Sequence, residues 1–327
     1  SGSLNGGRLR PEHYGVYADY FVRFVRAYRE HGLPVDAVTV QNEPHHETSG
    51  YPSMRMPAAE QAAFVRDALG PAFQAAGLDT KILVWDHNWD EPEYPLAVLQ
   101  DPAVRAFVDG VAWHCYGGNV AAQNRVRTAF PDVDTYFTEC SGGDWDQNFG
   151  SVLRWNMQNL FIRSVRNGAR TVLLWNLALD ENRGPHRGGC GNCRGVVTLP
   201  AGGGATYEPE YYVIGHLSKF VVPGAHRIAS SSYEGDLESV AFRNPDGSLV
   251  LVVLNAGSAP RRFAVVWNGT HVTYDGLAAG AVATLRWTPA GTLARLLGAG
   301  GDFFDLGTNF GGPEGVWVST TNAKGVG

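Results

Sequence analysis

The chain has 327 residues, of which 44% are hydrophobic, and 26 basic against 32 acidic residues give a formal net charge of −6. This length allows one large domain, or one large and one small domain. A mildly acidic chain is a poor match for nucleic acid, so we expect no nucleic-acid partner. The apolar runs are all shorter than the roughly 18 residues that a membrane span needs, so we expect no stable membrane insertion.

From residue 11 to about 220, helical and strand patterns alternate along the chain. Helices are expected near residues 11–32, 58–76, 95–107, 120–130, 153–165 and 211–220, and apolar strands at residues 35–41, 81–86, 110–116, 135–139 and 170–177. Strands that alternate with helices form βαβ units and pair in parallel. The pattern predicts an α/β fold, either a barrel or a doubly wound sheet. No Gly-rich phosphate loop follows these strands, which disfavours nucleotide binding.

After residue 222 the pattern changes to short β-rich runs. They cover residues 225–232, 237–242, 248–255, 261–266 and 281–287. The Asn-Pro-Asp-Gly sequence at residues 244–247 predicts a hairpin turn between two of them. We therefore expect three parts, which are an α/β domain at residues 1–222, a small antiparallel β domain at residues 223–287, and a Gly-rich tail at residues 288–327 whose structure the pattern leaves undetermined.

Polar and aromatic residues collect where each predicted strand ends. They are Asn42 and Glu43, Asp86 and His87, His114 and Tyr116, Glu139, and Trp175. The carboxyl ends of parallel strands meet at one edge of the sheet, and in a (β/α)8 barrel this edge holds the active site. Five successive strands that end in this way predict an active site there.

Two of these strand ends carry a carboxylate, Glu43 and Glu139. A pair of carboxylates facing a cleft is what glycoside hydrolysis needs, because one protonates the leaving oxygen and the other attacks the anomeric carbon. The plain alternative for each is a helix-capping or loop carboxylate. Nearby, Asn42 can bind the hydroxyl next to the reacting carbon, Tyr116 can donate to the nucleophile, and Trp175 can stack on the sugar.

Three other residues at the strand ends have two interpretations each. His114 is either a substrate contact or a hydrogen-bonded core residue, and Asp86 and His87 either line the cleft or lie outside it. The spacing of His87, His114 and Glu43 does not support a metal site, so no metal is predicted.

The four cysteines fall into two groups. Cys115 and Cys140 each lie in an apolar run, which predicts buried free thiols. Cys190 and Cys193 form a CxxC motif in a Gly-rich stretch, and no second ligand pair follows as a zinc site would need. We expect a local disulfide between Cys190 and Cys193, which favours an extracellular, secreted protein.

Four segments together resemble glycoside hydrolase family 30, which includes glucosylceramidases and β-1,6-glucanases. They are VTVQNEP at residues 38–44, FTECSGG at 137–143, LLWNLALD at 173–180 and GHLSKFVVPGAHRI at 215–228. The resemblance covers about residues 1–287. It implies a (β/α)8 barrel joined to a β-sandwich, a retaining mechanism and no cofactor.

The resemblance also implies roles for single residues. Glu43 matches the family's acid/base, Glu139 its nucleophile, and Asn42, Tyr116 and Trp175 its sugar contacts. In addition, the stretch GPHRGGCGNCRG at residues 184–195 is similar to the loop after the last barrel strand in bacterial members.

The start of the sequence, SLNGG at residues 3–7, resembles the family's loop after the third barrel strand. The five predicted strands then correspond to strands four to eight of the barrel. We therefore expect the sequence to lack the family's first three barrel strands and the N-terminal strand that joins the sandwich.

The expected function is that of a retaining β-glycoside hydrolase acting on β-glucosides in a carbohydrate or glycolipid. Glucosylceramidase-like and β-1,6-glucanase-like activities both fit, and a xylanase or fucosidase is a further option within the same class. The alternative is a non-catalytic carbohydrate-binding remnant of a truncated glycosidase.

Overall fold

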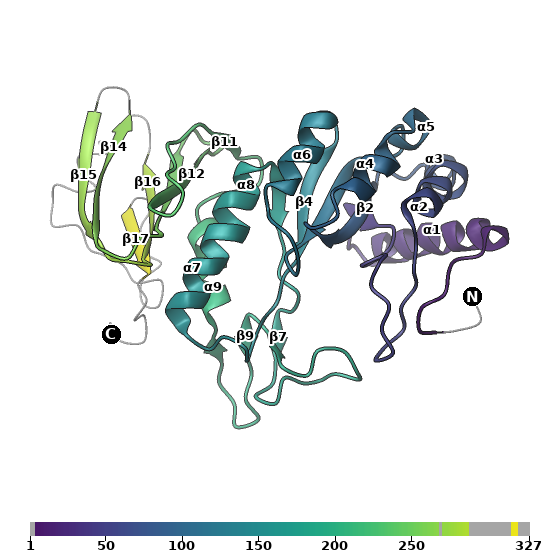
Figure 1. Ribbon diagram of the computed structural model, residues 1–327, viewed down its shortest axis with the longest axis horizontal. Helices are drawn as coiled ribbons and strands as arrows, with labels where there is room; N and C mark the ends of the chain where they lie inside the picture. Colours follow the sequence, from purple (N-terminus) through teal and green to yellow (C-terminus); the bar gives the residue numbers. More distant parts are fainter. Residues whose placement is uncertain (1–3, 268–269, 288–314, 320–327) are drawn as a thin grey trace. The chain divides into compact units, whose positions relative to one another are not determined.

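A computed structural model describes residues 4–267, 270–287 and 315–319 of the chain (Figure 1). The chain divides into two compact units. The first comprises Ser1–Cys140, Asn167–Trp175 and His186–Gly191, and the second comprises Ser141–Arg166, Asn176–Pro185 and Asn192–Gly327. The domain limits near residues 222 and 287 remain a prediction.

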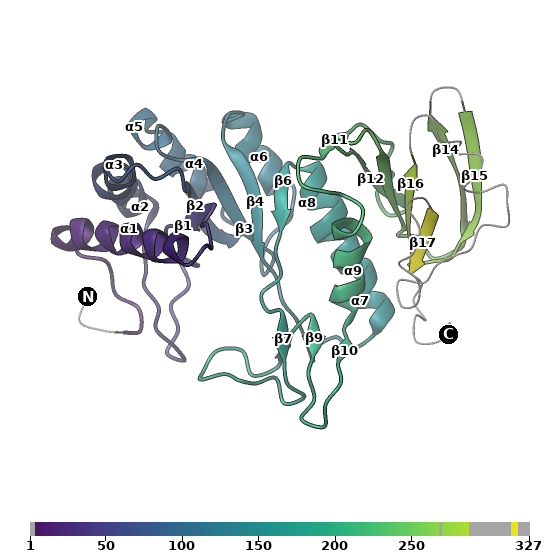
Figure 2. The same cartoon turned by 180° about the vertical axis from the view of Figure 1, so that it is seen from behind.

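The first unit is built on a parallel five-stranded sheet with the order β1-β2-β3-β4-β6, curled into a half-barrel (Figure 2). The strands are β1 (Ala37–Thr39), β2 (Lys81–Asn88), β3 (Gly110–His114), β4 (Asp134–Glu139) and β6 (Ala169–Val172). All of β3 and the middle of β2 are buried. Continuous burial is expected for strands covered on both faces, and it explains their unbroken apolar sequence. The predicted partial parallel barrel is confirmed.

A proline divides one of the predicted helices of this unit. The helices are α1 (Tyr14–Glu30), α2 (Ala58–Phe64), α3 (Gly70–Ala75), α4 (Glu93–Leu99), α5 (Pro102–Arg105) and α6 (Ala122–Ala129), with a 3-10 turn η1 (Pro11–His13) and a π-helical turn η2 (Val65–Leu69). The predicted single helix at residues 95–107 is wrong, because Asp101 caps a new helix at Pro102 by accepting from Ala103 N. The predicted helix at residues 58–76 stays continuous as α2, η2 and α3, and Pro71, which has no N–H to donate, follows its π-turn.

The strand β6 is shorter than the predicted strand at residues 170–177. Its pairing with β4 contains a register shift, and the regular ladder stops at Val172. Beyond it, Leu173 N donates to Phe137 O over 3.1 Å and Trp175 N to Cys140 O over 2.9 Å. The segment therefore still follows β4, although it leaves the strand conformation.

The second unit contains helices and three small pairings of strands. The helices are α7 (Phe149–Asn156), the π-helical η3 (Met157–Arg163), α8 (Ser164–Arg166) and α9 (Pro209–Ser218), and the strands are β5 (Gly142–Gly143) with β8 (Cys193–Arg194), and β7 (Ala178–Leu179), β9 (Val197–Thr198) and β10 (Thr206–Tyr207). A buried ion pair connects β8 with α9, with Arg194 Nη2 2.8 Å from Glu210 Oε1. Arg194 also donates to Gly143 O and Asp146 O, so its buried charge is fully paired.

The same unit contains the predicted antiparallel β domain, which is confirmed as a β-sandwich. One sheet has the order β11-β12-β13-β16-β17 and the other consists of β14 and β15. The strands are β11 (His226–Ile228), β12 (Leu237–Arg243), β13 (Leu249–Asn255), β14 (Arg261–Trp267), β15 (Thr270–Leu277), β16 (Val282–Trp287) and β17 (Gly315–Ser319). Leu249, Val253, Val265, Leu277 and Trp287 belong to the core that the two sheets share.

The predicted turn at residues 244–247 forms, with Gly247 N donating to Asn244 O over 2.9 Å between β12 and β13. The β-rich runs of the sequence do not include the strand β15, although the Asn-Gly dipeptide before it in the sequence is a turn signal. In the tail, β17 pairs with β16, and the rest of residues 288–327 lies outside the described residues.

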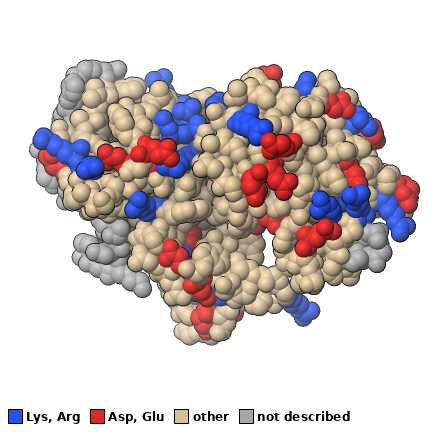
Figure 3. Space-filling view, in the orientation of Figure 1, with Lys and Arg blue, Asp and Glu red and all other residues tan. Residues whose placement is uncertain are grey.

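The described surface carries both signs of charge. Figure 3 shows basic and acidic side chains interspersed over the face seen there. This agrees with the small net charge of −6. Among the described residues, no helix combines the length and the apolar composition that crossing a membrane requires.

Candidate active site

The side chains predicted at the strand ends lie together at the carboxyl edge of the parallel sheet. Glu43 follows β1, Asp86 and His87 lie near the end of β2, His114 ends β3, and Glu139 ends β4. All of them belong to the first compact unit. The parallel order of the strands therefore brings groups from distant parts of the sequence into one cluster.

The members of this cluster differ in exposure. Tyr116 is 46% exposed and Trp175 is 37% exposed, whereas His114 is fully buried at 0% and Asp86 is also buried. Asn42, next to Glu43, is exposed as well. Exposed groups are open to a ligand, whereas buried groups act through the side chains that cover them.

Two β-bulges shape this edge of the sheet. Asp86 is the extra residue in the pairing of β2 with β3, and Thr138 is the extra residue in the pairing of β3 with β4. Trp85 and Asp86 both have positive φ, at 73° and 64°. A bulge changes the direction of a side chain. As a result the two extra residues meet, and Thr138 Oγ1 donates to Asp86 Oδ1 over 2.7 Å.

The backbone at Glu43 lies in the left-handed region, with a φ of 45°. For a residue other than glycine this conformation costs on the order of 1–3 kcal/mol, and such residues concentrate at functional sites. Two hydrogen bonds maintain it, since Glu43 N donates to Asp86 O over 3.0 Å and His46 N donates to Glu43 O over 2.8 Å. The chain therefore turns sharply at Glu43 instead of continuing the strand.

Both ring nitrogens of His114 face carboxylates. Nδ1 lies 3.0 Å from Glu43 Oε1 and 4.0 Å from Glu139 Oε1, and Nε2 lies 3.0 Å from Asp86 Oδ1. Burial lowers the pKa of His114, but hydrogen bonds to Asp86 and Glu43 and the nearby negative charges outweigh burial and raise the pKa to about 9. At neutral pH His114 is thus an imidazolium that donates from both nitrogens.

The hydrogen bond from His114 also lowers the pKa of Glu43. Burial raises the pKa of Glu43, but the hydrogen bond from His114 and the charges of His87, His114 and His46 lower it below its ordinary value. His87 Nε2 lies 3.9 Å from Glu43 Oε1. Burial and the charge of His114 lower the pKa of His87 more than the charge of Glu43 raises it.

Folding stability should depend on pH through His114. Its pKa is raised to about 9 in the folded protein, against an ordinary value of 6.5. The resulting stabilisation is complete below pH 6.5 and is lost as the pH rises through about 9. The variant Asp86→Asn removes one carboxylate charge but keeps an acceptor oxygen, so it should lower the pKa of His114. We measure the free energy of unfolding in urea at pH 6 and at pH 9.5. Its decrease between these two pH values should be about 2 kcal/mol larger in the wild type than in Asp86→Asn.

The matched control for this measurement is Asp19→Asn, which removes an exposed carboxylate paired with Arg23. It should keep the pH dependence of the wild type. The same pH dependence in Asp86→Asn as in the wild type would contradict the raised pKa of His114.

Glu139 is oriented by Tyr116, whose hydroxyl donates to Glu139 Oε1 over 3.0 Å. Burial raises the pKa of Glu139, the charge of His114 and the Tyr116 hydrogen bond oppose this, and the charges of Glu43 and Asp86 add to it, so the pKa stays above its ordinary value. A carboxylate oxygen of Glu43 and one of Glu139 lie within 4.8 Å of each other. The site is therefore a close pair of carboxylates with His114 against both.

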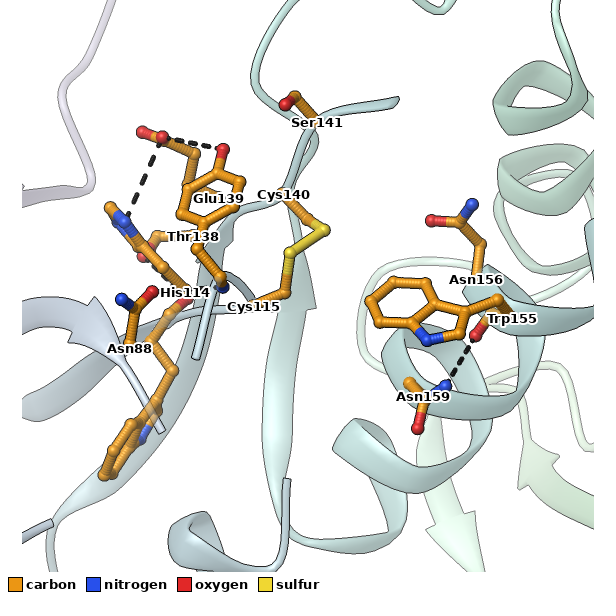
Figure 4. The surroundings of a disulfide bond; sticks show 12 residues. Asn88, His114, Cys115, Thr138, Glu139, Cys140, Ser141, Trp155, Asn156 and Asn159 are labelled. Carbon is orange, nitrogen blue, oxygen red and sulfur yellow. Dashed lines mark hydrogen bonds and ion pairs between the residues drawn. A yellow bond between two sulfur atoms is a disulfide. The ribbon is translucent and has the colours of Figure 1, made fainter. Parts of the chain in front are cut away.

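The cysteines beside this pair are not free thiols. Cys115 and Cys140 form a disulfide with their Cα atoms 5.4 Å apart (Figure 4). The prediction of two free thiols is wrong because it considers each cysteine within its own strand, whereas β3 and β4 are neighbours and end side by side. Cys190 and Cys193 are also disulfide-bonded, as their CxxC motif predicts.

Two further residues at the site were not predicted from the sequence. Thr138 is the bulge residue described above. Tyr51 lies on the loop after Glu43, with its hydroxyl 3.1 Å from His46 Nε2. Burial and the charges of Glu43 and Glu139 raise the pKa of Tyr51, which places it within electrostatic range of both carboxylates. A loop residue carries no periodic signal, so the sequence offers little to find Tyr51.

Glu43, His114 and Glu139 are close enough to one another to hold a metal ion. A metal would need the lone pair of His114 Nδ1. That atom instead lies at hydrogen-bond distance, 3.0 Å, from Glu43 Oε1. We therefore interpret the cluster as a hydrogen-bonded acid–base site.

A parallel β/α half-barrel with two neighbouring carboxylates at its carboxyl edge has the architecture and the site of a barrel glycosidase. Comparison with known proteins agrees with this class. The glycosyl hydrolase family 30 TIM-barrel domain matches residues 1–221, and the family's beta sandwich domain matches residues 224–285. The chain belongs to glycosyl hydrolase family 30.

Individual relatives are similar over most of this chain. An endo-1,6-β-D-glucanase of Trichoderma harzianum is 36% identical over 77% of the chain and 52% of its own length. The lysosomal acid glucosylceramidase of Mus musculus is 32% identical over 79% of the chain and 54% of its own length. A solved endo-β1,6-glucanase structure superposes with a TM-score of 0.83 at 35% identity, over 88% of this chain and 66% of that one. The chain spans about half the length of the curated relatives it matches.

Proposed function

We propose that this protein hydrolyses β-glucosides with retention of configuration. The observation that carries the proposal is the distance within 4.8 Å between oxygens of Glu43 and Glu139. Retaining glycosidases hold their two carboxyl groups about 5–5.5 Å apart, whereas inverting enzymes separate them by about 6.5–9.5 Å to admit a water molecule. The closer spacing favours direct attack by one carboxylate.

In the proposed mechanism, Glu139 attacks the anomeric carbon while Glu43 protonates the departing oxygen. This forms a covalent glycosyl ester on Glu139, and Glu43 is left as a carboxylate. Glu43 then takes a proton from water, which attacks the anomeric carbon and frees Glu139. Tyr116 orients the nucleophile, and Asn42, His87 and Trp175 contact the sugar.

His114 and Asp86 serve this mechanism from beneath the carboxylates. Both are buried, so we assign them to positioning rather than to sugar contact. The hydrogen bond of 3.0 Å between His114 Nδ1 and Glu43 Oε1 supports this assignment, because it places a proton donor on the group that must lose and regain a proton.

The pKa directions in the free site run against these roles. The pKa of Glu43 is lowered and that of Glu139 is raised, whereas the first step needs a protonated Glu43 and an ionised Glu139. A sugar that covers Glu43 removes water from it, which raises the pKa of Glu43. Positive charge that develops at the anomeric carbon stabilises the ionised form of Glu139. The proposal thus requires substrate binding to reverse the order of the two pKa values.

For the substrate, we propose a β-1,6-linked glucan before glucosylceramide. Three fungal endo-1,6-β-D-glucanases are 36–38% identical to the chain, whereas the mouse glucosylceramidase is 32% identical. We therefore expect kcat/KM to be higher on a β-1,6-glucan than on glucosylceramide when reducing sugar and released ceramide are measured in parallel. Preference for glucosylceramide would reverse the assignment, and activity on xylan alone would exclude both.

We further propose that the protein acts outside the cytoplasm and comes from a bacterium. Its two disulfides support an oxidising compartment, since such bonds are rare in reducing ones. The similarity of residues 184–195 to the loop of bacterial family members supports the source. Mass spectrometry of the protein in the culture medium of the producing organism tests the location.

A further inference from the structure

The Cys115–Cys140 disulfide lies beside the two residues that meet at the proposed nucleophile. Cys115 directly precedes Tyr116, and Cys140 directly follows Glu139. Figure 4 shows His114 and Cys115 at the end of one strand and Glu139 and Cys140 at the end of its neighbour. The covalent bond is therefore one residue away from each partner of the Tyr116–Glu139 hydrogen bond.

The disulfide begins where the hydrogen-bonded ladder ends. The last paired residues of β3 and β4 are His114 and Glu139, and the register shifts at Thr138 immediately before them. A bulge disrupts the ladder locally, so the pairing of the two strand ends is weakest at this point. Cys115 and Cys140 are the next residue on each strand, and their bond fixes the register covalently there.

Hydrogen bonds extend this connection to the neighbouring strands. Tyr116 N donates to Asn88 Oδ1 over 3.0 Å, at the end of β2, and Trp175 N donates to Cys140 O over 2.9 Å, after β6. Cys140 is only 2% exposed and Cys115 is partly buried, so the bond is largely covered at the edge of the sheet. Four strand ends are thus connected side to side, with the disulfide in the middle.

We propose that the Cys115–Cys140 disulfide is a positioning element that holds the Tyr116 hydroxyl on Glu139. The inference rests on the proposed function, in which Glu139 is the nucleophile. Tyr116 is 46% exposed and its ring meets the His114 ring edge to face, with the centroids 6.1 Å apart, so the position of its hydroxyl depends on where the end of β3 lies. Its donated hydrogen bond favours the ionised form of Glu139. Loss of the disulfide should therefore raise the pKa of Glu139 and slow the attack on the sugar.

The test compares Cys115→Ala/Cys140→Ala, Tyr116→Phe and the triple variant in the full chain. One readout is the titration of the Glu139 carboxyl by NMR, assigned with Glu139→Gln, and the other is kcat on an aryl β-glucoside. We expect the cysteine variant to raise the titration midpoint and to lower kcat at least about fivefold, with KM nearly unchanged. In the Tyr116→Phe background, removing the disulfide should leave the titration midpoint of Glu139 unchanged and should change kcat by no more than about twofold.

The matched control is Cys190→Ala/Cys193→Ala, which removes the other disulfide and should leave the Glu139 midpoint unchanged. An unchanged midpoint in Cys115→Ala/Cys140→Ala, or effects that add fully to those of Tyr116→Phe, would overturn the proposal. The titration needs no turnover, so a chain that titrates as expected but hydrolyses nothing would refute the proposed function alone.

If Cys115→Ala/Cys140→Ala does not fold, reduction of folded protein provides a second measurement. The folded Cys190→Ala/Cys193→Ala variant, in which Cys115–Cys140 is the disulfide that remains, is then reduced with a phosphine and titrated again, with circular dichroism as the check on folding. A raised Glu139 midpoint in reduced, folded protein supports the proposal. Unfolding on reduction would overturn it, because the bond would then serve the fold and not the position of Tyr116.

Discussion

Glu139→Gln should lower kcat on an aryl β-glucoside by at least about 10³-fold, because an amide cannot form the glycosyl ester. The amide oxygen still accepts from the Tyr116 hydroxyl, which lies 3.0 Å from Glu139 Oε1, so the fold should persist. Initial rates and thermal unfolding of the same preparation measure both effects. The matched control is Glu47→Gln, a partly exposed carboxylate paired with Arg55, which should keep wild-type activity.

The smaller variant Glu139→Ala identifies the role as well as the loss. Azide can occupy the space of the missing carboxylate and attack the anomeric carbon directly. Since one displacement inverts the centre, the expected product is the α-glucosyl azide, which NMR distinguishes from the β form. Formation of the β-glucosyl azide by this variant would contradict the assignment of Glu139 as nucleophile.

Glu43→Gln should lower kcat by about 10²–10⁴-fold for a substrate with a poor leaving group. The reason is that the departing alkoxide then receives no proton. A dinitrophenolate needs no proton, so the first step with a dinitrophenyl β-glucoside should stay close to wild type, and a rapid burst of phenolate should precede slow turnover. Stopped-flow absorbance measures the burst against the steady state.

Added azide should accelerate the slow turnover of Glu43→Gln and give the β-glucosyl azide, because it intercepts the ester on Glu139 and needs no base. The control is Glu91→Gln, a partly exposed carboxylate paired with His45, which should show neither burst nor azide effect. If the rate of the first step fell equally with good and poor leaving groups in Glu43→Gln, Glu43 would not be the acid.

Much of the site follows from the sequence by a short chain of reasoning. Alternating apolar strands and helices predict a parallel sheet, and a parallel sheet brings all carboxyl ends to one edge. Glu43 and Glu139 could therefore be paired although 96 positions separate their numbers. The structure confirms the parallel pairing of these strands, in the order β1-β2-β3-β4-β6.

What the sequence could not provide is the register between strands. The disulfide between Cys115 and Cys140 needs two strand ends to stop level with each other, and the contact of Thr138 with Asp86 needs a bulge in each of two strands. Both features depend on pairing between segments, while periodicity describes one segment at a time. The sequence does contain a signal for the break between α4 and α5, because Pro102 begins the second helix.

The central claim, that Glu139 attacks the sugar, is tested most directly by trapping the covalent intermediate. The protein is incubated with an activated 2-deoxy-2-fluoro-β-glucoside, digested and measured by mass spectrometry. We predict one fluoroglucosyl group on the peptide that contains Glu139, and none in Glu139→Gln. A label on the peptide that contains Glu43 would contradict the assignment of roles, and sugar binding without any label would favour a non-catalytic carbohydrate-binding protein.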